Sequence, residues 1–217
     1  MNPRHAEQSV VHSDHSNPTT WLWEISLKAA SVARYIDIMP ANRMAPDAVF
    51  FDIYPGEHYK LLQALCEVLD VNKAVEIGTF TGMGTYMLAQ HAQKVNTFDI
   101  VPWDKFEHSQ IDHDLIDSGR VTQHIADLSI TSQFDKYRKL LEEADLIFLD
   151  GPKDGKFEYA LWPLLKTLKR KNGRVLLVDD IRLMPMVKFW NDIEYPKMDM
   201  TSLGHWSGTG LVDLQHL

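Results

Sequence analysis

Along most of the chain, short apolar runs alternate with longer stretches in which apolar residues recur every three or four positions. The short runs are typical of buried strands and lie at 73–78, 94–100, 120–126, 144–150 and 174–180. The longer stretches are typical of amphipathic helices and lie near 82–92, 103–118, 132–142, 156–170 and 182–191. Strands and helices that alternate at this spacing predict a mostly parallel sheet with helices on both faces.

The two ends of the chain depart from this alternation. Helical spacing covers 21–38 and 57–70, on either side of a loop rich in proline. Near the other end, two extended runs within 197–217 are joined by Gly, Ser and Thr, which predicts a hairpin and an antiparallel strand. We therefore expect an α/β fold: a Rossmann-like, doubly wound, mostly parallel seven-stranded sheet that ends in an antiparallel hairpin.

The polar first twenty residues are expected to form a disordered tail before a single domain that spans 21–217. Within that domain, 21–72 would supply N-terminal helices and a lid, and 73–217 the Rossmann-like core. The lid is expected at 39–56, although loop residues that merely pack on the sheet explain this segment equally well.

Composition and charge exclude several classes of protein. A net charge of −8 over 217 residues disfavours a nucleic-acid partner, which requires a basic surface. No apolar run approaches the roughly 18 residues that span a bilayer, and the N-terminus lacks the apolar region of a signal peptide. The single cysteine, Cys66, lies in an apolar helical pattern and allows no internal disulfide. We expect a cytoplasmic protein without nucleic-acid or membrane partners; a monomer and a homodimer both remain open.

The turn EIGTFTG at 76–82 follows the first expected strand, where open α/β sheets bind ligands. Gly78 allows a sharp turn and close approach to a ligand, and Gly82 allows the next helix to begin close by. Phe80 interrupts the dinucleotide fingerprint, which disfavours a dehydrogenase, and no Gly-Lys-Ser/Thr follows, which excludes a P-loop. The spacing E-x-G-x-x-x-G resembles the first motif of S-adenosylmethionine-dependent methyltransferases; an ordinary tight turn is the alternative.

Acidic residues end the second and third expected strands. Asp99 lies 21 residues beyond Gly78, where a carboxylate can accept hydrogen bonds from ribose hydroxyls, and Asp127 can accept one from an adenine amino group. Each is also a plausible solvated strand end or helix cap. Together with the glycine turn, they predict a bound nucleoside. The expected contacts of S-adenosylmethionine are Glu76, Gly78, Thr79, Phe80, Gly82, Asp99, Ile100, Asp127, Leu128 and Asp150.

Three further aspartates end the fourth and fifth expected strands. Asp150, Asp179 and Asp180 would converge at one edge of the sheet, where their mutual repulsion calls for a cation. All-oxygen ligation favours Mg²⁺, with Mn²⁺ or Ca²⁺ as alternatives, although helix capping without a metal would also explain these residues. Lys153 is then a candidate general base, with a pKa lowered by the bound dication, or else a simple counter-charge to the acids.

The segments VEIGTFTG, FLDGPKDGKFEYALWPLL, NGRVLLVDDI and GTGLVDL, within residues 53–214, resemble the catechol and caffeoyl-CoA type O-methyltransferases. The resemblance implies a divalent cation held by two aspartates and an asparagine, with a lysine three residues after the first aspartate. Asp150, Asp179 and Lys153 match that pattern, and Asp180 stands in place of the asparagine. Val212 stands where the animal catechol enzymes carry a substrate-binding carboxylate, so a catechol is not assured.

The expected function is therefore S-adenosylmethionine-dependent, cation-assisted methyl transfer to a hydroxyl of a small molecule, either catechol-like or another vicinal diol. Lys153 and Asp150 would be catalytic, and Tyr54, His205 and Trp206 would contact the acceptor. Two alternatives remain: a metal-independent methyltransferase of the same fold for natural products or saccharides, and a non-catalytic nucleoside-binding subunit.

Overall fold

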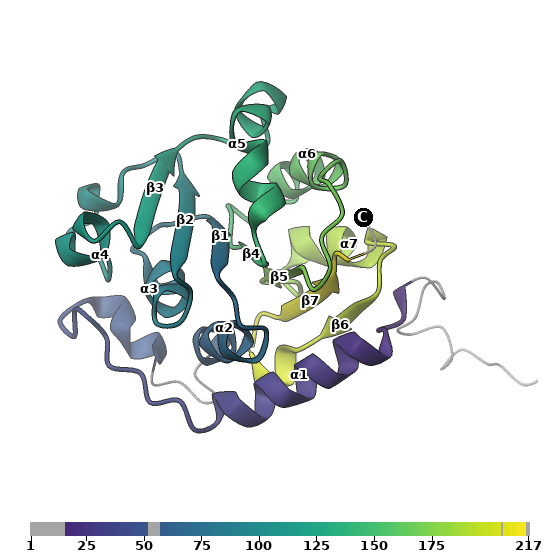
Figure 1. Ribbon diagram of the computed structural model, residues 1–217, viewed down its shortest axis with the longest axis horizontal. Helices are drawn as coiled ribbons and strands as arrows, with labels where there is room; N and C mark the ends of the chain where they lie inside the picture. Colours follow the sequence, from purple (N-terminus) through teal and green to yellow (C-terminus); the bar gives the residue numbers. More distant parts are fainter. Residues whose placement is uncertain (1–15, 52–56, 205, 216–217) are drawn as a thin grey trace, which may run out of the picture.

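The computed structural model describes residues 16–51, 57–204 and 206–215, and within them it forms one seven-stranded sheet (Figure 1). The strand order is β3-β2-β1-β4-β5-β7-β6. The first five strands are mutually parallel, and β7 is antiparallel to both of its neighbours. The predicted fold class is thereby confirmed. The strands are β1 (Lys73–Ile77), β2 (Lys94–Asp99), β3 (Val121–Ile125), β4 (Leu146–Leu149), β5 (Val175–Asp179), β6 (Lys197–Asp199) and β7 (Thr209–Asp213).

Two apolar cores, one on each face of the sheet, separate the helices into layers. On β1, Ala74 belongs to the core that includes α1, α2 and α3, whereas Val75 belongs to the core that includes α5, α6 and α7. This alternation is what the period of two along a strand requires. The helices are α1 (Thr20–Ala33), α2 (Glu57–Val68), α3 (Met83–Ala89), α4 (His113–Asp117), α5 (Thr131–Glu143), α6 (Lys156–Leu165) and α7 (Met184–Asp192).

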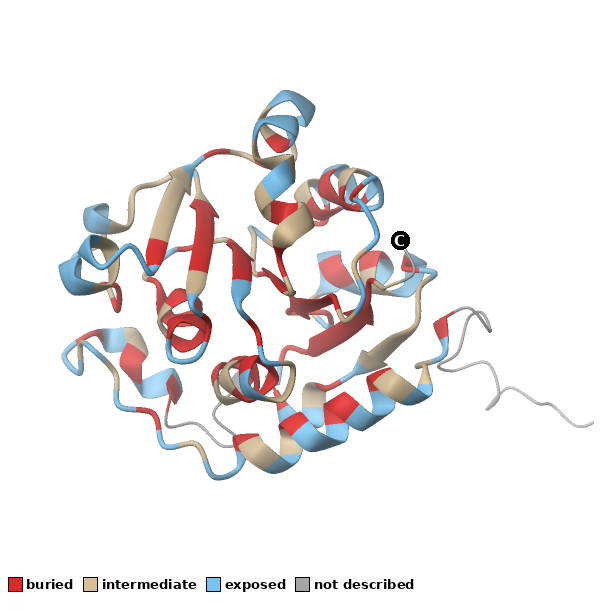
Figure 2. Ribbon diagram, viewed as in Figure 1, coloured by how far each residue is buried: buried red, intermediate tan, exposed pale blue. Residues whose placement is uncertain are grey.

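The central strands are buried on both faces, as Figure 2 shows by their red colour. Every residue of β4 and β5 is buried, and these strands read as unbroken apolar runs until Asp179, as parallel strands between two helical layers do. At the edge of the sheet, β3 is mostly half-buried. Strand order runs one way from β1 to β3 and the other way from β4 to β5, so the crevice for a ligand lies where β1 and β4 meet.

The predicted helix over 103–118 is wrong. The structure has instead a short 3-10 helix η4 (Trp103–Lys105), an irregular stretch and α4. The stretch is held away from a helical path because the backbone N–H of Gln110 donates to the carbonyl of Thr81 at 2.7 Å. The side-chain amide of Gln110 also forms two bonds of 2.9 Å with the backbone of Asn42. Long-range partners therefore override the local helical pattern.

Smaller differences occur near both ends of the chain. The expected loop at 39–57 contains a 3-10 helix, η3 (Pro46–Phe51), and the hairpin region contains another, η5 (Thr201–Leu203). The first fifteen residues of the expected tail lie outside the described residues, but Thr19 caps α1 by accepting from the Leu22 amide at 3.1 Å. Helix α1 lies along β6 in Figure 1, and Thr19 also donates to Asp213. None of the helices in the described ranges is both long enough and apolar enough to cross a membrane.

Candidate active site

A cavity of about 570 Å³ opens at the carboxyl ends of the parallel strands. Its walls come from the turns that follow β1 to β5, together with residues of η3 and α2. This position is the expected ligand crevice of an open α/β sheet. Most of the predicted cofactor contacts line it: Gly78, Thr79, Phe80, Asp99, Ile100, Asp127, Leu128 and Asp150.

The turn after β1 is shaped by backbone packing and by one carboxylate. Gly78 has φ of +107°, and a Cβ there would lie 1.9 Å from the backbone oxygen of Asp150. A larger residue would therefore collide with the end of β4 before it met a ligand. The backbone amides of Thr79 and Phe80 both donate to Oδ2 of Asp99 at 2.9 Å. Asp99 thus fixes the course of the turn and also lines the cavity.

The two strand-end acids, Asp99 and Asp127, both line the cavity. Asp99 accepts a further bond at Oδ1 from the Val101 amide at 3.0 Å. Asp127 accepts at Oδ1 from the amide and the hydroxyl of Ser129, at 2.9 and 2.6 Å. Asp127 is therefore a turn residue that also lines the cavity, and its contact with a nucleoside stays a prediction.

Two predicted cofactor residues, Glu76 and Gly82, are not among the residues that line the cavity. Gly82 has φ of +82° and precedes α3, so it starts that helix as expected. Glu76 is buried beneath the turn, where its Oε2 accepts bonds from the hydroxyls of Thr97 at 2.6 Å and of Thr85. The hydroxyl of Thr97 also lies 2.7 Å from the hydroxyl of Thr79. Glu76 therefore supports the turn from below.

Burial raises the pKa of Glu76 to about 8, although the hydroxyls of Thr85 and Thr97 lower it in part. The carboxyl group is thus largely protonated near neutral pH, which removes the cost of a buried charge.

The three aspartates converge around one lysine. Lys153 Nζ lies 2.7 Å from Oδ1 of Asp150, 3.0 Å from Oδ2 of Asp179 and 2.6 Å from Oδ2 of Asp180. Oδ1 of Asp180 accepts a hydrogen bond from the hydroxyl of Ser207, which lies in the chain shortly before β7. Residues from three separate segments are thereby gathered at one edge of the sheet.

Charge and burial act in opposite directions within this cluster. Burial, reinforced by the charge of Asp179, raises the pKa of Asp150 to about 7. Burial would also raise the pKa of Asp179, but the charges of His58 and Lys153 lower it. Burial alone would lower the pKa of Lys153, yet Asp150 and Asp179 outweigh it and raise that pKa. These carboxylates favour the ammonium form of Lys153, and the lowered pKa expected beside a bound dication stays a prediction.

His58 is the residue of this site that sequence reasoning missed. Its Nδ1 lies 3.2 Å from Oδ1 of Asp179, both side chains are almost fully buried, and His58 lines the cavity. A signal existed in the sequence, because His58 shares the buried face of α2 with Leu61 and Leu65 at helical spacing. A polar ring on an apolar face indicates a buried partner, but nothing in the sequence names Asp179, 121 residues further on, as that partner.

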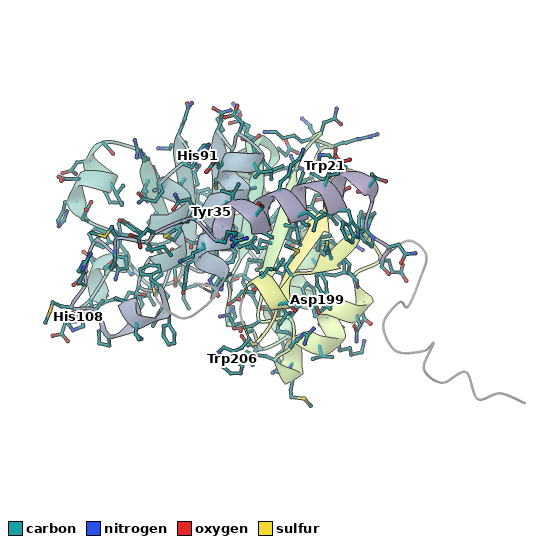
Figure 3. All side chains as sticks on the ribbon, turned by 90° about the horizontal axis from the view of Figure 1, so that it is seen from below. Trp21, Tyr35, His91, His108, Asp199 and Trp206 are labelled. Atoms are coloured by element: carbon teal, nitrogen blue, oxygen red, sulfur yellow. The ribbon has the colours of Figure 1, made fainter. Side chains whose placement is uncertain are left out.

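The predicted acceptor contacts are supported least. Tyr54 and His205 lie outside the described residues. Trp206 is 76% exposed and does not line the cavity; in Figure 3 it projects from the rim of the molecule. The segment expected as a lid instead contributes Asp47 and Phe50 to the cavity wall. The hydroxyl of Thr81 donates to Asp47 at 2.5 Å and so joins η3 to the turn after β1.

The donor set fits a divalent cation. Three carboxylates face one ammonium, so the acids outnumber the lysine in a largely buried cluster. Oδ1 of Asp179 is buried and accepts no aligned hydrogen bond from the residues that the structure describes. Carboxylate oxygens are suitable ligands for Mg²⁺, Ca²⁺ and Mn²⁺.

Comparison with known proteins relates this fold to methyltransferases. Residues 75–181 match a family of methyltransferase domains, whereas no curated protein sequence matches the chain. Among solved structures, a methyltransferase from Geobacter sulfurreducens is similar with a TM-score of 0.55 and 14% identity, over 97% of this chain and 94% of that one. The methyltransferase PaMTH1 of Podospora anserina gives a TM-score of 0.53 and 14% identity, over 88% of each chain.

The O-methyltransferase TomG of Streptomyces achromogenes, solved with S-adenosylmethionine, gives a TM-score of 0.51 and 18% identity, over 97% of this chain and 94% of that one. The matched family segment contains the turn after β1 and the acids at the ends of β2 to β5. Residues 75–181 are therefore a methyltransferase domain, as the sequence predicts, and the solved structures show that the chain has the fold of the S-adenosylmethionine-dependent methyltransferases.

Proposed function

We propose that the protein transfers the methyl group of S-adenosylmethionine to a hydroxyl oxygen of a small molecule, and that a divalent cation assists the transfer. The observation that carries this proposal is the position of the carboxylate cluster. Asp150 lies both on the wall of the cofactor cavity and in the cluster around Lys153, so the donor and the acceptor would meet at this residue. A vicinal diol, such as a catechol, is the acceptor class proposed, because two adjacent oxygens can bind one cation.

The protein's own residues would align the two reactants. The turn after β1 and the acids Asp99 and Asp127 would hold the cofactor, because they line the cavity that Asp150 shares with the cluster. Alignment and exclusion of water are the main contributions that a protein makes to in-line displacement. Lys153 Nζ lies within the cluster, where its neutral amine would accept the acceptor's proton.

Asp150, Asp179 and Asp180 would hold the cation, with Mg²⁺ as the first candidate and Mn²⁺ or Ca²⁺ as alternatives. When bound, it would supply a Lewis acid that lowers the pKa of a coordinated hydroxyl.

Removal of the cation tests this function. With a panel of diol acceptors, an excess of chelator should abolish methyl transfer, and Mg²⁺ or Mn²⁺ should restore it. The Asp150→Ala variant should lose calorimetric binding of the cation, whereas the exposed-site variant Asp104→Ala should keep it. Full transfer in excess chelator would contradict the metal-assisted proposal and favour a metal-independent methyltransferase of the same fold.

A further inference from the structure

We propose that His58 is a nitrogen ligand of the divalent cation, together with Asp150 and Asp179, so that the centre is a mixed nitrogen–oxygen site. This inference rests on the proposed function, which assigns a cation to the carboxylates but names only oxygen ligands. One ligand atom from each of these three residues can be chosen so that all three atoms lie within 4.8 Å of one another.

The fold brings His58 and Asp179 to the same side of the sheet. On β5, Val175 and Leu177 belong to the core that also includes α2, and Asp179 follows at the same period of two. His58 lies in the first turn of α2. Its Nδ1 and Oδ1 of Asp179 are 3.2 Å apart. Two ligands on one cation, each about 2.1 Å from it and at right angles, are separated by about 3 Å.

The two oxygens of Asp179 face different groups. Oδ2 faces the ammonium of Lys153 at 3.0 Å, whereas Oδ1 faces His58. Oδ1 is the buried atom that accepts no aligned hydrogen bond within the described part of the chain. Both oxygens of Asp180 already have partners, one in Lys153 and one in Ser207. Oδ1 of Asp179 is therefore the oxygen that can bind a cation beside His58.

The ring of His58 is held in place by its neighbours. The rings of Tyr59 and Phe148 lie 4.2 and 5.2 Å from it, centroid to centroid, and its side chain is 3% exposed. Such packing fixes the direction of a ligand before the metal binds. An imidazole nitrogen also changes the choice of metal, because transition metals accept nitrogen ligands more readily than Mg²⁺ and Ca²⁺, which prefer oxygen.

Pulsed electron paramagnetic resonance of bound Mn²⁺ tests the assignment directly. The full-length protein loaded with Mn²⁺ should show coupling to ¹⁴N, and ¹⁵N-labelling of histidine alone should convert that coupling to ¹⁵N. His58→Gln should lose the coupling and bind Mn²⁺ at least about tenfold more weakly, since even outer-shell changes cost ten- to a hundred-fold. His91→Gln, at an exposed position, should behave as the unaltered protein does.

The outcomes separate this inference from the function on which it rests. If Mn²⁺ binds in an Asp150-dependent way but shows no histidine coupling, His58 is not a ligand and the cation-assisted function stands. If His58→Gln keeps both Mn²⁺ affinity and the preference for Mn²⁺ over Mg²⁺, His58 only orients Asp179 and the inference fails. If the unaltered protein binds neither ion, the inference and the metal-assisted function both fail.

Discussion

Lys153 has two possible roles, and a single substitution separates them. If it accepts the acceptor's proton, Lys153→Arg should lower turnover by a typical general-base factor, roughly 10²–10⁴, because a guanidinium stays protonated. The affinity for S-adenosylhomocysteine should hardly change, as isothermal titration calorimetry would show. Near-normal turnover in Lys153→Arg would mean that the lysine only balances the charge of Asp150, Asp179 and Asp180.

Glu76 should make the stability of the fold depend on pH. Its pKa is about 8 in the folded protein and near 4.5 when unfolded. Between these values the folded state keeps a proton that the unfolded state has lost, so the free energy of unfolding falls as pH rises. The contribution is complete below pH 4.5 and is lost as pH rises through about 8. Its slope is on the order of 1 kcal/mol per pH unit.

Urea denaturation of Glu76→Gln at several pH values measures the contribution of Glu76 to the free energy of unfolding. The difference in unfolding free energy between the variant and the unaltered protein should shift in the variant's favour from pH 5 to pH 8. The same shift should be absent in Glu107→Gln, which alters an exposed carboxylate. A difference that does not change with pH would show that Glu76 is ionised in the folded protein at neutral pH.

Helix α3 is packed so closely on β1 and β4 that its one glycine has no room for a methyl group. A Cβ on Gly84 would lie 2.3 Å from Oε1 of Glu76 and 2.8 Å from the ring of Phe148. Alanine is favoured over glycine in helices by about 1 kcal/mol, but overpacking typically costs about 1–3 kcal/mol. Gly84→Ala should therefore lower the unfolding free energy, measured by chemical denaturation. A more stable variant would show that α3 can move away from β1.

The sequence predicted elements well where local pattern and tertiary packing agree. The parallel strands are apolar because both of their faces are covered, so β4 and β5 can be predicted from their apolar composition alone. The conformation of residues 103–118 could not be predicted from the sequence, because it depends on hydrogen bonds to Thr81 and Asn42, which are distant in sequence. The acid cluster was predictable because parallel strands end at one edge of the sheet. His58 lies instead on a helix, and the order of the strands does not predict which residues that helix contacts.

At the scale of the whole molecule, cofactor binding should couple to stability. At about 100 times its dissociation constant, S-adenosylhomocysteine should raise the free energy of unfolding by about 2.7 kcal/mol. For a chain of this length, each kcal/mol of added stability raises the Tm by about 2–4 °C, so the Tm should rise by several degrees. Asp99→Asn should reduce that shift, and Asp104→Asn, at an exposed position, should not. No shift in the unaltered protein would contradict the assigned cofactor cavity.

The order of the last three strands has a consequence for biosynthesis. Strand β7 follows β6 in the chain, yet it is inserted between β5 and β6. Until β7 has emerged from the ribosome, β6 has no neighbour in the sheet and the apolar edge of β5 stays open. A nascent chain halted before residue 209 would display that edge to other chains, which is the setting in which strands aggregate. Ribosome pausing in this short interval would therefore leave the edge of β5 open to pairing with another chain.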